Sequence, residues 1–161
     1  MDVVRRNNVV VSGRADGQPM VFAHGFGCDQ AMWRFVAPEF EDDFRVVVFD
    51  HVGAGGSDLG AYDVERYSSL AGYATDVNES CRALDLRDVV LVGHSAGSIV
   101  AAELAAAEGG KSSDGVVHVE PAEERLERNV AIADVGEERT DAALGERDRD
   151  PNRARVDRVF H

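Results

Sequence analysis

The chain has 161 residues, which suits one domain of ordinary size, and 44% of them are hydrophobic, enough for a buried core. Its formal net charge of −13 repels phosphate groups, so we expect neither nucleic acid nor an anionic membrane surface as a partner. The sequence has no apolar run long enough to span a bilayer, and its first residues lack the apolar region of a secretory signal, which predicts a cytoplasmic protein.

Four short apolar runs predict strands of a parallel sheet. They are residues 20–23, 46–49, 89–92 and 116–119, and residues 8–12 form a weaker candidate at the start. The runs are continuous rather than alternating, which is typical of strands covered by helices on both faces. Because helical patterns separate them, we expect an α/β fold with a doubly wound, mostly parallel sheet.

Three helices are predicted between these strands. Asp29 is a plausible N-cap of the first, which carries Trp33 on its apolar side and ends near Pro38. The third runs from about residue 97 to residue 108. The second has one apolar stripe that faces the sheet, formed by Leu70, Tyr73, Val77, Cys81 and Leu84.

The sequence GHSAG at residues 93–97 directly follows one predicted strand and opens the third helix. In this context a G-x-S-x-G sequence is typical of a nucleophile elbow, whose tight turn strains the serine backbone and exposes its hydroxyl. Gly93 and Gly97 lack the Cβ atoms that would collide in so tight a turn. We therefore predict Ser95 as a catalytic nucleophile, with His94 among the supporting residues. The alternative is a glycine-bounded turn whose serine only caps the helix.

The sequence HGFG at residues 24–27 follows the strand predicted at 20–23. Because the carboxyl ends of neighbouring parallel strands open on one edge of a sheet, we expect this loop beside Ser95. The backbone N–H groups of Phe26 and Ala96 would then form an oxyanion hole. For His24 we favour a ring that orders the loop by hydrogen bonds over a catalytic role. The supporting residues of this loop are His24, Gly25 and Gly27.

Residues 50–58 form a glycine-rich segment after the strand predicted at 46–49. Gly53 starts a pattern that resembles a dinucleotide-binding fingerprint, but Asp58 stands where its third glycine is needed. A sharp turn, in which Asp50 and Ser57 bond backbone groups, is the better interpretation. The two cysteines are far apart and form no metal-binding pattern, so we expect no cofactor and no metal.

From residue 6 to residue 104 the chain resembles the N-terminal core of an α/β-hydrolase. More narrowly, it resembles the RsbQ-type stress-signalling hydrolases of bacteria, which are relatives of the plant karrikin and strigolactone receptors. The resemblance implies a serine hydrolase that acts on a small apolar or ester-like molecule through an acyl-serine intermediate at Ser95. It also implies a role in stress signalling with a protein partner. The runs that carry it are RNN at 6–8, FAHGFGCDQ at 22–30, MWRFVAP at 32–38, FDHVGAGGSD at 49–58 and GHSAG at 93–97.

The resemblance places the triad acid and histidine after two further strands, beyond a helical lid. The histidines downstream of Ser95 are His118, inside a predicted strand, and His161, the last residue. Neither matches a family position, so neither is assigned as the general base. Asp134 and Asp141 precede no suitable strand and are not assigned as the acid. Without an imidazole beside it Ser95 stays a neutral alcohol, so we expect impaired catalysis.

The composition changes near Pro121. Residues 122–161 hold eleven acidic and eight arginine residues but only eight Leu, Ile, Val or Phe. We predict a partial α/β-hydrolase core over residues 1–121, which lacks the lid and the last strands and exposes strand 116–119 as a sheet edge, and a charged, poorly ordered tail over 122–161. Three explanations stay open: a truncated or frame-shifted reading frame that gives a nonfunctional fragment, a short module that binds or signals without catalysis, and a fragment completed by another chain.

Overall fold

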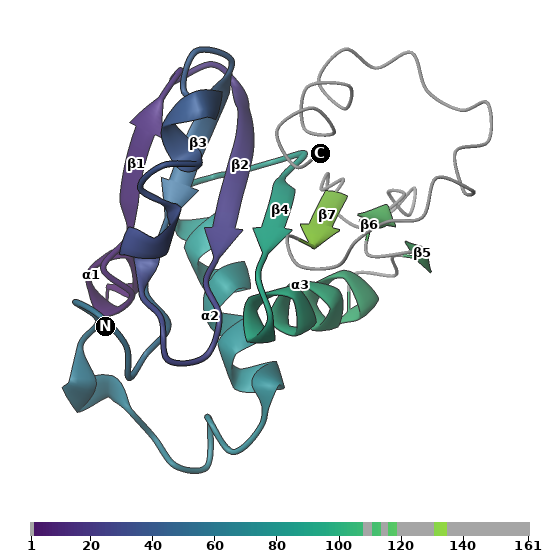
Figure 1. The fold of residues 1–161 in the computed structure, drawn as a ribbon. Coiled ribbons are helices and arrows are strands. Elements are labelled where there is room, and N and C mark those ends of the chain that lie inside the picture. The colour runs from purple at the N-terminus through teal and green to yellow at the C-terminus, as the bar shows by residue number, and fades with distance from the viewer. Residues whose placement is uncertain (1, 108–110, 114–115, 119–130, 135–161) are drawn as a thin grey trace.

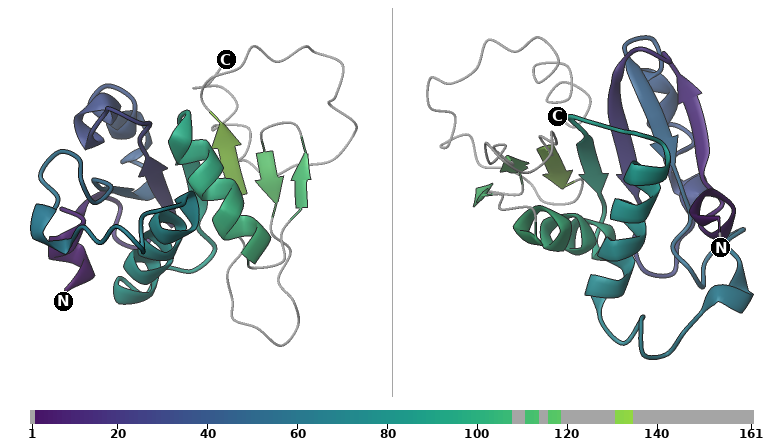
Figure 2. Two further views of the ribbon diagram at one scale, coloured as in Figure 1. Left: turned by 90° about the horizontal axis from the view of Figure 1, so that it is seen from below. Right: turned by 180° about the vertical axis from the view of Figure 1, so that it is seen from behind.

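The computed structural model describes residues 2–107, 111–113, 116–118 and 131–134 of the chain. At its centre lies a mixed sheet, along which two longer helices pack side by side (Figures 1 and 2). The described strands are β1 (Val10–Gly13), β2 (Gln18–Ala23), β3 (Phe44–Val48), β4 (Val90–Gly93), β5 (Lys111–Ser113), β6 (Val116–His118) and β7 (Ala131–Asp134). The described helices are α1 (Val3–Arg6), α2 (Leu70–Ala83) and α3 (Ala96–Ala107), with 3-10 turns η1 (Gln30–Trp33), η2 (Ala37–Phe40) and η3 (Leu59–Ala61).

The order of the described strands is β1-β3-β2-β4-β7-β6-β5. The four central strands β3, β2, β4 and β7 are parallel, whereas β1 at one edge and β6 and β5 at the other pair antiparallel with their neighbours. This architecture confirms the predicted α/β fold. The strand before the HGFG loop lies directly beside the strand before Ser95, and their last residues, Ala23 and Gly93, pair with each other. Both loops therefore leave the sheet at the carboxyl ends of these parallel strands (Figure 1).

Side chains that alternate along the parallel strands build one hydrophobic core on each face of the sheet. Val21 and Leu91 belong to the core that α2 and α3 cover. Phe22, the neighbour of Val21, belongs to the opposite core, where its ring centroid lies 5.1 Å from that of Trp33 and 5.9 Å from that of Phe40. Burial of one such side chain contributes about 2 kcal/mol to stability. Because both faces are buried, these strands have continuous apolar sequences.

The apolar stripe predicted for the second helix is confirmed in α2. Val77 and Cys81 are buried in the core between the sheet and the helices. Leu70, Tyr73 and Leu84 are partly buried and pack against the same core. The spacing of three and four residues therefore identified the face of this helix that meets the sheet.

Residues 30–40 do not form the single helix that the Asp29 cap predicts. Asp29 does cap a turn, because its carboxylate accepts a hydrogen bond from the Ala31 N–H at 2.8 Å, but this turn is η1, which ends at Trp33. Pro38 lies in the first turn of η2 instead of ending a helix. A proline is tolerated there because an N–H at that position would have no intrahelical partner. Two short turns thus bring Trp33 and Phe40 into the core.

Two described strands differ from the sequence-based expectation. β6 lies between β7 and β5, so the prediction that it forms a sheet edge is wrong. β7 lies inside the segment predicted to contain no strand, and it pairs with β4. Its sequence, AIAD, holds a single large apolar residue, so it does not stand out as an apolar run. Residues 119–130 and 135–161 lie outside the described residues, so the domain boundary near Pro121 stays a prediction.

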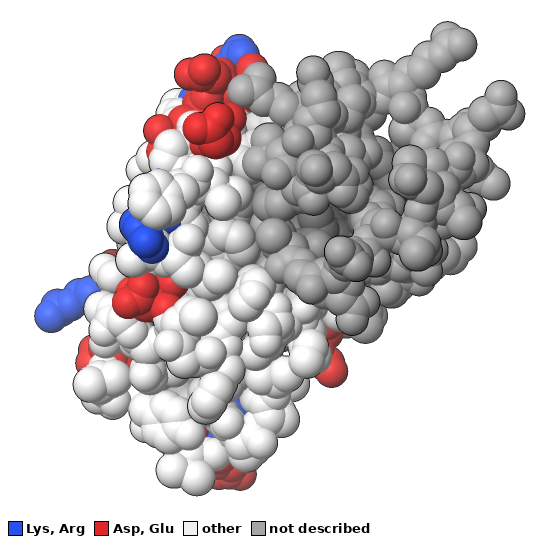
Figure 3. Space-filling model, in the orientation of Figure 1, with Lys and Arg blue, Asp and Glu red and all other residues white. Residues whose placement is uncertain are grey.

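The surface agrees with an acidic chain. In Figure 3, acidic side chains gather at one end of the described part of this face, and most of the remaining described surface carries no charge. None of the described helices combines the length and the apolar character that crossing a bilayer requires.

Candidate functional site

Ser95 occupies the junction where β4 turns directly into α3. Its φ of +53° lies in the left-handed region, which costs a non-glycine residue about 1–2 kcal/mol. A Cβ added to Gly93 would lie 2.6 Å from the Cα of Ser98, and one added to Gly97 would lie 2.2 Å from the Ala23 carbonyl oxygen. The turn therefore has no space for a side chain at either glycine. The Ser95 side chain itself is exposed.

The HGFG loop lies against this junction. Gly25 makes the contact, since a Cβ there would lie 3.2 Å from the Ser95 Cβ. The same Cβ would lie 2.8 Å from Nδ1 of His94, a ring nitrogen that is buried without a hydrogen-bond partner among the described residues. The amide N–H groups of Phe26 and Ala96 donate to no other described group. Neither amide is therefore occupied by a hydrogen bond within the described part of the chain.

His24 orders the HGFG loop. Its Nε2 accepts a hydrogen bond from the His51 backbone N–H at 3.0 Å. Nδ1 therefore carries the proton of the neutral ring and donates to the Gly25 carbonyl oxygen at 2.9 Å. The protein uses both ring nitrogens, which gives His24 a structural role and leaves no lone pair for catalysis.

The Asp50 carboxylate joins three segments of the chain. It accepts hydrogen bonds from the Asn8 side chain at 2.8 Å, from the backbone and side-chain N–H groups of Gln30 at 2.7 and 3.0 Å, and from the Gly56 N–H at 2.8 Å. Burial acts to raise the pKa of this carboxyl, but the hydrogen bonds outweigh burial and lower the pKa below its ordinary value. The Ser57 hydroxyl bonds two backbone groups of the same segment, which forms the turn predicted there.

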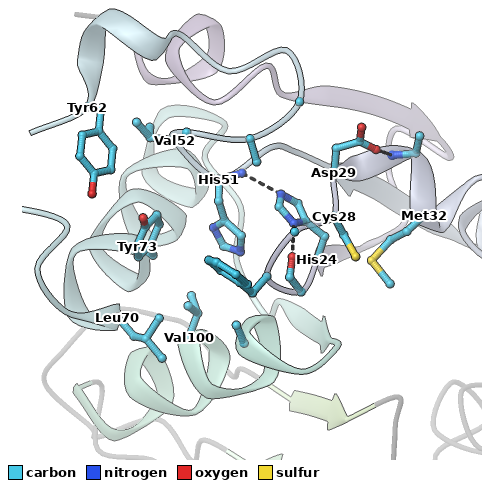
Figure 4. Close-up of a pocket in the computed structure, with 18 of the residues that line it drawn as sticks. His24, Cys28, Asp29, Met32, His51, Val52, Tyr62, Leu70, Tyr73 and Val100 are labelled. Atoms are coloured by element: carbon cyan, nitrogen blue, oxygen red, sulfur yellow. Dashed lines mark hydrogen bonds between the residues drawn. The ribbon is translucent and has the colours of Figure 1, made fainter.

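A cavity of about 930 Å³ opens beside the HGFG loop (Figure 4). Gly25 and Ala96, the neighbours of Ser95, form part of its wall, although the Ser95 side chain does not line it. The segment after β2, the turn after β3, Tyr62 at the end of η3, α2 and α3 supply the rest of the described lining. The cavity therefore ends next to the nucleophile predicted from the sequence.

His51 is a buried polar side chain of this cavity, and it is only 8% exposed. Its ring lies edge-on to those of Phe49 and Tyr73, with centroids 5.1 and 5.5 Å away. Neither of its ring nitrogens has a hydrogen-bond partner among the described residues. Burial, reinforced by the neighbouring His24, lowers the pKa of His51 to about 4, so the ring is uncharged at neutral pH. The sequence predicts no role for His51, which is marked only by its position directly after Asp50.

Three tyrosines form a row of contacting rings that the sequence does not reveal. The rings of Tyr62 and Tyr67 are stacked with centroids 5.4 Å apart, and Tyr73 follows at 4.8 Å from Tyr67. The Tyr67 hydroxyl donates to the buried Asp76 carboxylate at 2.9 Å. Burial, together with this hydrogen bond, raises the pKa of Tyr67 to about 12. Asp76 also pairs with two arginines, so an ion-pair cluster anchors the row.

No described group forms a hydrogen bond with the Ser95 hydroxyl. His118 is the last residue of β6, and His161 and Asp141 lie outside the described residues. Asp134 is the last residue of β7. Asp134 pairs in register with Gly93, the last residue of β4. The backbone of Asp134 therefore lies at the carboxyl end of the sheet, where Ser95 also lies.

The fold and the elbow define a class of protein. The sequence model of the alpha/beta hydrolase fold family matches residues 18–153, and the chain belongs to this family. The resemblance stated from the sequence is thereby confirmed.

Individual relatives agree with this assignment. The chain is 40% identical to the karrikin insensitive 2 receptor CA of Petunia hybrida over 98 residues, which are 61% of this chain and 36% of that protein. It is 33% identical to a strigolactone esterase of Arabidopsis thaliana over 62% of this chain and 37% of that protein. A solved hydrolase structure from Oleispira antarctica is 52% identical with a TM-score of 0.64, over 67% of this chain and 39% of that one. The chain thus spans little more than a third of the length of these relatives.

Proposed function

We propose that the chain is a serine hydrolase of low activity that acts on small ester-like substrates through an acyl intermediate on Ser95. The observation that carries the proposal is the left-handed φ of Ser95 at the junction of β4 and α3, with Gly25 packed against it. The free amides of Phe26 and Ala96 support an oxyanion hole beside this serine.

In the proposed reaction the Ser95 Oγ attacks the ester carbonyl carbon, while the N–H groups of Phe26 and Ala96 hold the negative oxygen. The bond to the alcohol then breaks, and the alcohol leaves with the hydroxyl proton. Water adds to the acyl carbon, the bond to Ser95 breaks, and the products are a carboxylic acid and the restored hydroxyl. Since no described base contacts Ser95, its proton moves through solvent. Loss of triad residues slows hydrolases by factors on the order of 10⁴–10⁶, which sets the expected rate.

A fluorophosphonate probe tests the proposal, because it reacts with activated serines. We expect slow labelling of the wild-type chain and none of Ser95→Ala. Ser98→Ala is the matched control, since this second serine of the turn donates its hydroxyl to the Ser95 carbonyl but has no catalytic role here. Labelling of all three chains, or of none, contradicts the proposal.

A second candidate is a module of RsbQ type that binds a small apolar molecule without catalysis and signals through a protein partner. Two observations favour it: the cavity is present while no described base contacts Ser95, and the relatives include a protein named as a receptor. This candidate predicts ligand-dependent thermal stabilisation that is equal in the wild-type chain and in Ser95→Ala, together with no probe labelling. A nonfunctional fragment would show neither response.

A further inference from the structure

Tyr62 presents an open aromatic surface to the cavity. It is 48% exposed, and Figure 4 shows it at the border of the cavity, on the same side as Tyr73. Its ring is stacked on Tyr67 at an interplanar angle of 22°. Gly53 adjoins the ring edge, where an added Cβ would lie 3.7 Å from Cδ2 of Tyr62. One face of the ring is thus covered by the protein, and its exposed surface borders the cavity.

The support of this ring is rigid. Tyr67 is buried, its hydroxyl is bound to Asp76, and the Arg66 guanidinium lies 5.7 Å from its ring centre. Asp76 is fully buried and pairs with Arg6 at 2.9 Å as well as with Arg66. Tyr62 therefore stacks on a ring that is buried and anchored by a hydrogen bond. A surface ordered before binding loses little conformational entropy when a ligand stacks on it.

The aromatic residues that line this side of the cavity are Tyr62, Tyr73 and His51. The row continues from Tyr62 through Tyr67 and Tyr73 to His51, whose pKa of about 4 keeps it neutral. The charged side chains of the cavity, Asp29 and Arg34, belong to the segment after β2, and in Figure 4 Asp29 lies on the other side of His51 from Tyr62. Asp29 caps η1, and the guanidinium carbon of Arg34 lies 4.3 Å from the ring centroid of Phe35. An uncharged ligand therefore suits the tyrosine side of the cavity.

We propose that Tyr62 determines ligand specificity by stacking on a planar aromatic group of an uncharged ligand, so that the cavity prefers an aromatic ring to a saturated ring of similar size. Aromatic pairs gain stability beyond the area they bury, whereas a saturated ring gains only from burial. The inference rests on the proposed function only in taking aryl esters as the substrate class. Binding itself does not require Ser95 to react.

The test compares 2-naphthol with decahydro-2-naphthol, which has the same carbon skeleton but no aromatic ring. Binding to the full chain carrying Ser95→Ala is measured by titration calorimetry. We expect 2-naphthol to bind about fivefold more tightly. Tyr62→Leu should abolish this preference, and Tyr62→Phe, the matched control, should keep it. An unchanged ratio in Tyr62→Leu, or no binding of either compound, overturns the inference.

A second measurement does not depend on how well a Tyr62 variant folds. In the nuclear magnetic resonance spectrum of the Ser95→Ala chain, 2-naphthol should shift the Tyr62 ring protons, whereas decahydro-2-naphthol should leave them in place. Shifts at other residues alone contradict the stacking site. Failure of probe labelling at Ser95 would overturn the proposed function and leave the aromatic preference intact. A labelled Ser95 without an aromatic preference would overturn only the inference about Tyr62.

Discussion

Acidification from neutral pH should destabilise the protein through His51. The folded state keeps this ring neutral down to a pKa of about 4, whereas the ring of an unfolded chain is protonated below its ordinary pKa of 6.5. Between these two values the unfolded state binds more protons, so the free energy of unfolding falls as the pH falls. The loss of unfolding free energy is absent well above pH 6.5 and complete well below about pH 4. A shift of this size corresponds to about 3 kcal/mol in total, of which about 2.5 kcal/mol is lost by about pH 4.5.

His51→Phe isolates this contribution. The phenyl ring preserves the edge-on contacts with Phe49 and Tyr73, and the backbone N–H that bonds His24 is unchanged. Urea unfolding of both chains at about pH 7 and about pH 4.5 gives the two differences in free energy. Carboxyl groups with lowered pKa values, such as Asp50, affect both chains alike and cancel in the comparison. Equal losses in the wild-type chain and in His51→Phe would refute the reasoning.

Three further sets of substitutions test the packing around the site. Asp50→Ala removes the shared acceptor of four hydrogen bonds and should lower the free energy of unfolding in urea by about 3–5 kcal/mol. Asp50→Asn should cost less because its amide oxygen still accepts, and equal losses would count against this account. Gly97→Ala should destabilise the fold severely because its Cβ meets a β2 carbonyl. Gly27→Ala has no atom within 4 Å of its Cβ and only a φ of +73° to oppose it, so it should cost about 1 kcal/mol. A lower melting temperature for Gly27→Ala than for Gly97→Ala would be incompatible with this packing. Tyr67→Phe loses its hydrogen bond to Asp76 and should lower the free energy of unfolding in urea by about 1.5–3 kcal/mol. It should also remove the tyrosine whose pKa is about 12 from a spectrophotometric titration, and if that titration survives, the assignment of this pKa is wrong.

The adjacency of the HGFG loop and Ser95 could be predicted because its causes are local in the sequence. Two continuous apolar runs indicate strands buried on both faces, and parallel neighbours end at one edge of the sheet. The glycines at 93 and 97 indicate a turn too tight for side chains, which the short distances at both positions explain. The catalytic role of Ser95 does not follow from this geometry and stays a proposal.

The contacts that sequence reasoning missed join separate segments of the chain. Asp50 gathers donors from Asn8, Gln30 and Gly56, and no periodic pattern links these positions. The tyrosine row depends on Tyr67, whose hydroxyl donates to the Asp76 carboxylate in α2. The turns η1 and η2 differ from the predicted helix for a related reason. Trp33 and Phe40 reach the core from two short turns, so tertiary packing overrides the local capping signal.

The strained backbone of Ser95 links the turn that the sequence predicts with the long-range contacts that it does not reveal. A left-handed serine persists only where its surroundings determine the backbone more strongly than the strain opposes it. Gly97 packs on the end of β2, and Gly25 packs on Ser95 itself, so the elbow depends on the position of the HGFG loop. That loop is held by His24 at its start, while the segment that follows it is held by Asp50 through Gln30. The long-range contacts absent from any sequence pattern are therefore the ones that support the locally predicted elbow.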